Sequence, residues 1–185
     1  WRPPGSVAHD SCGHGARLLF HSVEPQYIAE TGISIIMSAV LKLLRPHQYV
    51  KNGFVLLGPL FAHQWAAETL MSAGMAFAAF CAIASAVYVL NDLLDIESDR
   101  VHPTKSARPL PSGQVSLPLA KGLILGLVLV ALILGMCTSL AVATCLAAYF
   151  GLNVLYSWRL KHVVVLDVFL IAAGFMLRIL AGTVG

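Results

Sequence analysis

The feature that most constrains this chain is a pair of long stretches without any charged side chain. The stretch from Thr69 to Asn91 has 23 such residues and the stretch from Gly122 to Trp158 has 37. A helix rises about 1.5 Å per residue, so about 20 apolar residues cross the hydrocarbon core of a membrane. Soluble domains carry about 25% charged residues, but this chain of 185 residues has 11% charged and 58% hydrophobic residues. We therefore predict an all-α integral membrane protein, and we exclude a soluble domain, a disordered tail and a nucleic-acid-binding protein.

The uncharged stretches and the apolar segments on either side of them divide into five predicted transmembrane helices. The longest would reach about 55 Å as one helix, so we expect a break within residues 135–139. The predicted spans are about 46–64, 69–92, 117–135, 138–157 and 163–185. The apolar residues 33–40 are predicted to form a short interfacial helix, and Gly122 and Gly126 to permit close helix packing.

The ends of the chain differ from this pattern. Residues 1–32 lack hydrophobic periodicity and the features of a secretory signal, so they are left unassigned, and residues 33–185 are predicted to form one transmembrane domain. The chain begins at Trp1 and stops at Gly185 inside an apolar run. We therefore expect it to be the N-terminal part of a longer protein.

Nine of the twelve basic residues fall on one predicted side of the membrane. They lie before the first span, between spans two and three, and between spans four and five: Lys42, Arg45, Lys51, Arg100, Lys105, Arg108, Lys121, Arg159 and Lys161. Because cytoplasmic loops are enriched in Lys and Arg, this side is predicted to be cytoplasmic, in a bacterial inner or plasma membrane. Setting the orientation is also the simplest role for Arg45 and Lys51.

An acidic cluster follows the second predicted span. Asp92, Asp95 and Asp99 are spaced by three and four residues, which places their carboxylates on one face of a continuing helix. Their repulsion favours a compensating cation, and Mg²⁺ prefers carboxylate and phosphate oxygens. The basic residues nearby, Arg100, Lys105 and Arg108, have the chemistry to bind phosphate groups. The spacing is equally compatible with a diphosphate site and with a solvated loop whose charges pair with one another.

The motifs around this cluster resemble a known family. Asn91-Asp92-x-x-Asp95-x-x-x-Asp99, followed by Arg108-Pro109-x-x-x-Gly113, resembles the first aspartate motif of the UbiA superfamily of intramembrane prenyltransferases. Four further stretches resemble the branch that transfers phosphoribosyl groups to polyprenyl phosphates: Leu44–Asn52, His102-Pro103-x-Lys105, Tyr156-Ser157-x-x-Leu160-Lys161 and Gly174-Phe175-x-x-Arg178.

The resemblance implies a bundle of nine helices, with two motifs facing each other across a cavity that holds Mg²⁺ and a diphosphate. By this resemblance Asp92, Asp95 and Asp99 are the catalytic metal ligands. The residues implied to bind or orient substrate phosphates are Asn91, Arg100, Lys105, Arg108, Tyr156 and Lys161, with Lys51, Asp167 and Arg178 as further candidates. The family's second motif lies beyond the fifth span, so this chain alone is expected to be inactive.

Three functions follow as hypotheses. The first is Mg²⁺-dependent transfer of 5-phosphoribosyl from phosphoribosyl pyrophosphate to a polyprenyl phosphate, with loss of pyrophosphate. The second is prenylation of an aromatic acceptor by a polyprenyl diphosphate, as in quinone, haem or chlorophyll pathways. The third is half of a cation-coupled transporter, which is less consistent with acidic residues at the end of a span because transporter sites lie near the membrane midplane. All three predict membrane lipids as surroundings and no nucleic-acid partner.

Overall fold

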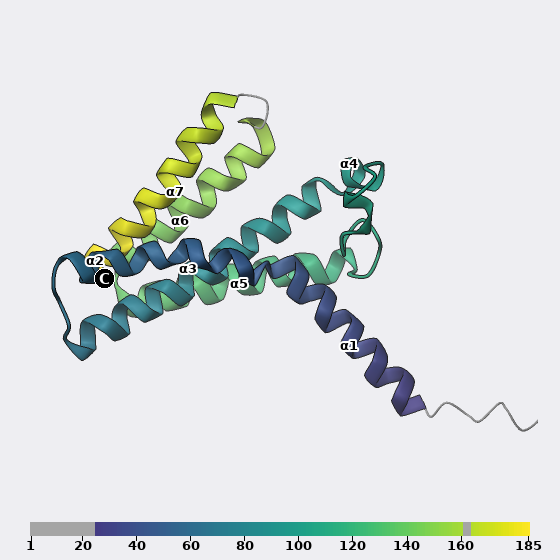
Figure 1. Cartoon of the computed structure of the whole chain (residues 1–185), viewed down its shortest axis with the longest axis horizontal. Coiled ribbons are helices and arrows are strands. Elements are labelled where there is room, and N and C mark those ends of the chain that lie inside the picture. The colour runs from purple at the N-terminus through teal and green to yellow at the C-terminus, as the bar shows by residue number, and fades with distance from the viewer. Residues whose placement is uncertain (1–24, 161–163) are drawn as a thin grey trace, which may run out of the picture. The chain divides into compact units, whose positions relative to one another are not determined.

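The computed structural model describes residues 25–160 and 164–185, and every element in these ranges is a helix (Figure 1). The chain divides into two compact units, Trp1–Ile35 and Ile36–Gly185. The prediction of an all-α chain is confirmed. The elements are α1 (Pro25–Leu44), η1 (Pro46–Leu56), α2 (Leu57–Phe61), α3 (Ala67–Leu94), α4 (Ile96–Arg100), η2 (Lys105–Ala107), α5 (Leu117–Thr138), α6 (Leu140–Leu155), η3 (Tyr156–Leu160) and α7 (Val164–Val184).

Four helical segments in the described ranges are long and apolar enough to cross a membrane. They are Ala67–Leu94, Leu117–Thr138, Leu140–Trp158 and Leu166–Val184. The third continues from α6 into the π-helical turn η3. Together with the apolar composition, these segments are those of an integral membrane protein.

The predicted span 46–64 differs from the other four. It is built from an 11-residue 3-10 helix, η1, and the five-residue helix α2, so it is wrong to describe it as one α-helix. Pro46, Gly53, Gly58 and Pro59 explain the difference, since proline removes a helical hydrogen bond and glycine weakens an α-helix. Because a 3-10 helix rises about 2.0 Å per residue, η1 and α2 still extend about 30 Å together.

Helix α3 is the centre of the second unit. It contacts η1, α5, α6 and α7, and Figure 1 shows α5 along it and α6 beside α7. The buried core combines Phe80, Ile83 and Val87 of α3 with Val142 and Leu146 of α6. Helices in membranes associate through close packing rather than by leaving water. This packing therefore fixes α3, whose last turn carries Asp92 and leads into the other acidic residues.

A smaller apolar cluster fixes the chain around the acidic residues. Ala39 and Leu43 from the end of α1 pack with Val89 of α3 and with Leu110 and Val115 of the loop before α5. All five are at most 3% exposed. The basic residues on this loop are thereby held beside the end of α3.

A close approach of two backbones involves Gly58 and Gly182, whose packing the sequence analysis did not predict. A Cβ atom on Gly182 of α7 would lie 1.8 Å from the carbonyl oxygen of Val55, and one on Gly58 would lie 2.4 Å from the carbonyl carbon of Gly182. By contrast, a Cβ on Gly122 or Gly126 would meet no described atom within 4 Å. The predicted close packing at Gly122 and Gly126 is therefore wrong for the described residues, because α5 presents these glycines to open space.

Ser139 ends one span and begins the next, within the segment where a break was expected. Its hydroxyl accepts from the N–H of Val142 at 3.1 Å and donates to the carbonyl of Val184 at 3.1 Å. We expect Ser139→Ala to lower the free energy of unfolding by about 1 kcal/mol, as the loss of an N-cap does. Thermal unfolding in detergent measures the change, with Ser112→Ala as a control because Ser112 bonds only within its own turn. An equal shift in both variants would contradict the capping role.

Candidate functional site

The acidic residues lie where α3 gives way to α4. Asp95 occupies the junction with φ −94° and ψ 3°, and the helical hydrogen-bond spacing continues through it. The N–H of Asp95 donates to the carbonyl of Asn91 at 3.0 Å, and the N–H of Asp99 donates to that of Asp95 at 2.8 Å. Asp92 and Asp99 therefore face the same way, as their spacing of seven residues predicts.

Arg108 joins these two buried carboxylates. Its Nη1 atom donates to Oδ1 of Asp92 at 3.2 Å and to Oδ2 of Asp99 at 2.7 Å. Lys105 adds its Nζ atom at 3.8 Å from Oδ1 of Asp99. Asp92 and Asp99 are 4% and 2% exposed, and buried carboxylates require such partners. Arg108 is therefore a cation that compensates the acidic face.

Arg45 is the second partner of Asp92, with Nη2 at 2.6 Å from Oδ1. Its guanidinium lies 5.3 Å from the centre of the Tyr88 ring. The backbone of Arg45 is left-handed, with φ 51° and ψ 56°, which costs a non-glycine residue about 1–2 kcal/mol. The sequence analysis gave Arg45 only an orienting role. The sequence feature that indicated a larger role for Arg45 was its position in Leu44–Asn52, a stretch that resembles the phosphoribosyl-transferring branch.

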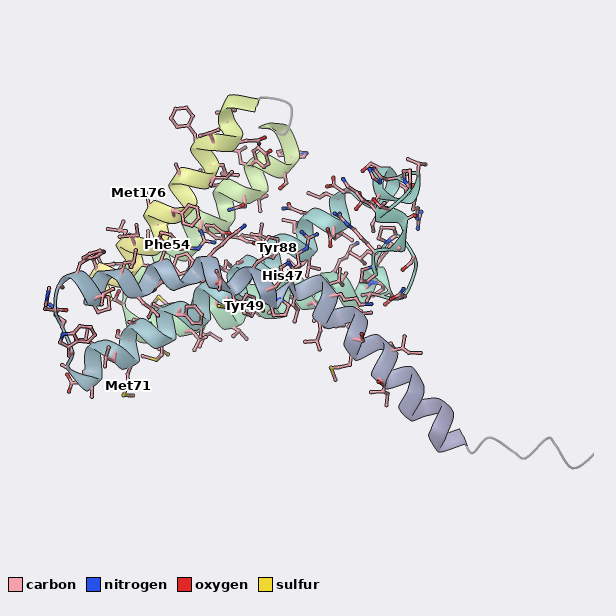
Figure 2. The ribbon with its side chains drawn as sticks, in the orientation of Figure 1. His47, Tyr49, Phe54, Met71, Tyr88 and Met176 are labelled. Carbon is pink, nitrogen blue, oxygen red and sulfur yellow. The ribbon has the colours of Figure 1, made fainter. Side chains whose placement is uncertain are left out.

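The turn at Arg45 is fixed from α3. Ser85 donates to the carbonyl of Leu44 at 3.0 Å and accepts from the hydroxyl of Tyr49 at 2.8 Å. These contacts hold the chain on both sides of Arg45. Figure 2 labels Tyr49, Tyr88 and His47 around this point. The left-handed residue is therefore held by its neighbours, which is how such strain persists at functional sites.

A basic cavity of about 360 Å³ opens over Asp92. Three cationic side chains, Lys42, Arg45 and Arg108, contribute to its wall together with His47. The remaining lining residues are Asp92, Thr104, Ala107 and Pro109. Arginine binds phosphate oxygens in a bidentate manner, so this cavity has the composition of a phosphate or diphosphate site.

A second cavity of about 270 Å³ lies on the other side of the end of α3. Asn91, the neighbour of Asp92, lines it and accepts a hydrogen bond from Ser157 at 2.5 Å. The candidates Lys51 and Arg178 also line it. Adjacent residues on a helix point about 100° apart, so Asn91 and Asp92 serve different cavities.

The remaining predicted residues lie elsewhere. Arg100 pairs with Glu97 at 3.0 Å in an exposed position. Tyr156 donates a hydrogen bond to Asp167 and lines a third, apolar cavity of about 180 Å³. Lys161 lies outside the described residues. The structure thus brings Asp92, Asp99, Lys105 and Arg108 together, and it adds Arg45 to them.

The residues at the end of α3 fit a magnesium ion of the substrate-bound kind. Among the described residues, no group of three His, Cys, Asp or Glu side chains is placed to hold a metal. Mg²⁺ is usually held by one or two carboxylates, with waters and substrate phosphates completing its shell. Asp92 and Asp99 offer hard oxygen donors beside a basic cavity, which matches this requirement. Whether Asp92, Asp95 and Asp99 all bind the metal stays a prediction.

These features define a class of protein: an integral membrane protein of packed helices with a basic cavity at the end of one helix. Comparison with known proteins identifies the family. Residues 53–185 match the UbiA prenyltransferase family, and the chain belongs to it.

Individual relatives agree with this assignment. The chain is 38% identical to the decaprenyl-phosphate phosphoribosyltransferase of Corynebacterium glutamicum, over 80% of this chain and 46% of the relative. It is 35% identical to the enzyme of that name from Mycolicibacterium smegmatis, over 80% and 48%. A solved UbiA homolog from Archaeoglobus fulgidus, bound to GPP and Mg²⁺, has a TM-score of 0.65 and 19% identity, over 78% of this chain and 53% of that structure. The chain spans about half the length of the relatives it matches.

Proposed function

We propose that this chain contributes the first half-site of a Mg²⁺-dependent membrane transferase that displaces pyrophosphate. The proposed reaction moves a 5-phosphoribosyl group from phosphoribosyl pyrophosphate to a polyprenyl phosphate. One observation carries the proposal: Arg45 and Arg108 converge on the buried Asp92 in a cavity that Lys42 makes more basic. The names of the relatives at 35–38% identity support the same reaction.

The residues of the basic cavity have distinct proposed roles. Arg45, Arg108 and Lys42 bind the phosphate oxygens of the donor. Asp92 and Asp99 hold Arg108 in position, and they would also hold Mg²⁺. A bound Mg²⁺ would stabilise the negative charge that develops on the departing pyrophosphate. The arrangement is suited to a donor with several charges, because its cations are already oriented before the substrate arrives.

The other predicted residues complete the proposal. Asn91 orients the end of α3 through its bond with Ser157, and the Tyr156–Asp167 pair shapes the adjoining lipid-facing cavity. Further phosphate contacts are proposed for Lys105, Arg100 and Lys161, and a metal-ligand role for Asp95. The charged end of the bundle is proposed to face the cytoplasm, where a phosphorylated sugar donor is available.

The experiment uses protein expressed in membranes from its complete gene, with Mg²⁺, polyprenyl phosphate and labelled phosphoribosyl pyrophosphate. We expect a labelled lipid that disappears with EDTA and returns with Mg²⁺. Asp95→Asn is expected to reduce its formation at least about 100-fold, since it removes charge at a site of electrostatic stabilisation, whereas the exposed Glu97→Gln is expected to change it less than about twofold.

The donor is tested in a parallel reaction. The same membranes receive a polyprenyl diphosphate and an aromatic acid in place of the phosphoribosyl donor. Prenylation of the acid without phosphoribosyl transfer would overturn the proposed donor. Activity that persists in EDTA would overturn the proposed magnesium requirement.

A further inference from the structure

Arg178 is a buried cation inside a predicted membrane span, far along the chain from the acidic cluster. It lies on α7 and is 5% exposed. Its Nε atom donates to Asn52 Oδ1 at 2.8 Å, Nη1 to the Gly174 carbonyl at 2.8 Å, and Nη2 to the Tyr149 hydroxyl at 3.1 Å. The guanidinium is therefore held rigidly by partners on η1, α6 and α7.

The recorded partners of Arg178 are all uncharged. Rings of Tyr149, Phe80 and Phe175 lie 4.8, 5.7 and 5.8 Å from its guanidinium carbon, and among the described residues no carboxylate forms an ion pair with it. Placing a charged side chain within a bilayer is energetically unfavourable. The aromatic rings and hydrogen bonds offset part of this cost. Among the described residues, the positive charge of Arg178 is therefore not neutralised by a carboxylate ion pair.

Arg178 lines the cavity of about 270 Å³. A guanidinium has five N–H groups, more than its three recorded hydrogen bonds use. Lys51 lies in the same wall, and Asn91 and Asn153 add amide groups. The rest of the wall is mainly apolar, with Val87, Leu170, Ile171 and Phe175 beside the two tyrosines Tyr88 and Tyr149. Two cations in a mostly apolar cavity match a ligand with an anionic head and a hydrocarbon body.

The size and position of this cavity narrow the choice of ligand. Ligand pockets are typically about 300–1,000 Å³, so it has room for a headgroup and the first part of a chain rather than a whole lipid. Asn91 lines it, whereas the adjacent Asp92 lines the basic cavity. Two cavities with cationic lining residues therefore flank the end of α3, and the residues that line them there are adjacent in sequence.

We infer that Arg178 and Lys51 bind the phosphate group of the lipid substrate, in a site separate from the Arg45–Arg108 site. This inference rests on the proposed function for the identity of the lipid as an acceptor. The binding itself depends only on the cavity. Arg178 supplies an oriented guanidinium fork, and Lys51, which is exposed, supplies a second charge at the cavity wall.

The test measures binding of a short-chain polyprenyl monophosphate to the complete protein in detergent, without a donor. We expect Arg178→Gln to weaken binding at least about 30-fold, since truncating one partner of a buried charge pair costs about 2–5 kcal/mol. Lys51→Gln is expected to weaken binding about three- to tenfold. The control Lys121→Gln removes an exposed cation that does not line this cavity, and it is expected to change binding less than twofold.

Further ligands and variants separate the possible outcomes. Binding of the uncharged polyprenol is expected to be equal in wild type and Arg178→Gln, and inorganic phosphate is expected to compete weakly. Arg178→Lys keeps the positive charge but lacks the planar guanidinium. A folded Arg178→Lys protein with wild-type affinity for the monophosphate would therefore overturn the proposed role of the guanidinium.

Two other outcomes would overturn the proposed phosphate site. The first is unchanged affinity for the monophosphate in both Lys51→Gln and a folded Arg178→Gln protein. The second is competition by phosphoribosyl pyrophosphate that depends on Arg178, which would assign the cavity to the donor and overturn the inference.

The assay also distinguishes this inference from the proposed function. If phosphoribosyl transfer is not observed but the lipid monophosphate binds with the expected dependence on Arg178, the proposed phosphate site is supported and the proposed reaction is refuted. If phosphoribosyl transfer occurs but Arg178→Gln leaves the KM for the lipid unchanged, the reaction stands and the site is refuted.

Discussion

Replacing Arg108 with glutamine is expected to reduce turnover at least about 100-fold, the effect of losing one oriented electrostatic donor. It is also expected to lower the free energy of unfolding by about 2 kcal/mol, because Asp92 and Asp99 lose a shared partner in a buried position. This value is at the lower end of the destabilisation that follows from removing one partner of a buried ion pair, because one third of the Arg108 side chain is exposed. Labelled-lipid formation and thermal unfolding in detergent measure the two effects.

A second substitution separates the two roles of Arg108. Asp99→Asn removes the carboxylate at 2.7 Å from it, so the double variant Arg108→Gln with Asp99→Asn is expected to recover about half of the lost stability but none of the activity. Arg100→Gln is the matched control for the stability measurement alone, since its pair with Glu97 is exposed and such pairs contribute about 0–1 kcal/mol. Activity in the double variant near the wild-type level would show that Arg108 only neutralises the acidic face.

Replacing Gly182 with alanine is expected to have the largest effect on folding. The added Cβ would lie 1.8 Å from the carbonyl oxygen of Val55, and a backbone atom cannot move aside as a side-chain end does. The crossing of η1 and α7 must then open, at a cost of at least about 3 kcal/mol. The yield of monodisperse protein from membranes and its unfolding temperature measure the effect.

Gly126→Ala is the matched control for this substitution. The position lies within α5 and offers open space to a Cβ among the described atoms. Alanine in a helix is favoured over glycine by about 0.5–1 kcal/mol, so this variant is expected to be at least as stable as the wild type. A Gly182→Ala protein that unfolds at the same temperature as Gly126→Ala would contradict the close approach of η1 and α7.

The sequence predicts those features that depend on local pattern. The charge-free stretches predict helices α3, α5 and α6, and the apolar run from residue 163 onward predicts α7, because a span needs only about 20 mainly apolar residues in succession. The seven-residue spacing of Asp92 and Asp99 predicts a shared face, since two helical turns nearly repeat the direction of a side chain. Arg108 was predicted as a phosphate ligand, and its pairing with both carboxylates is compatible with that prediction.

Features that depend on tertiary contacts could not be predicted in this way. The partnership of Arg45 with Asp92 joins residues 47 positions apart and requires a left-handed turn before a proline. The bond from Arg178 to Asn52 spans 126 positions, and neither residue belongs to a periodic pattern. The glycine contact between η1 and α7 likewise depends on how two distant segments cross, whereas the regular Gly122 and Gly126 spacing suggested a contact that the described residues do not make.

The left-handed backbone of Arg45 has a consequence for directed evolution. Glycine adopts this conformation freely, so Arg45→Gly would relieve the backbone while removing a guanidinium that lines the basic cavity. Selection for heat resistance would weigh the relieved backbone against the lost partner of the buried Asp92, whereas selection for catalysis would reject glycine because it removes a cation from the cavity. Sequencing position 45 after each selection would therefore reveal which property had constrained it.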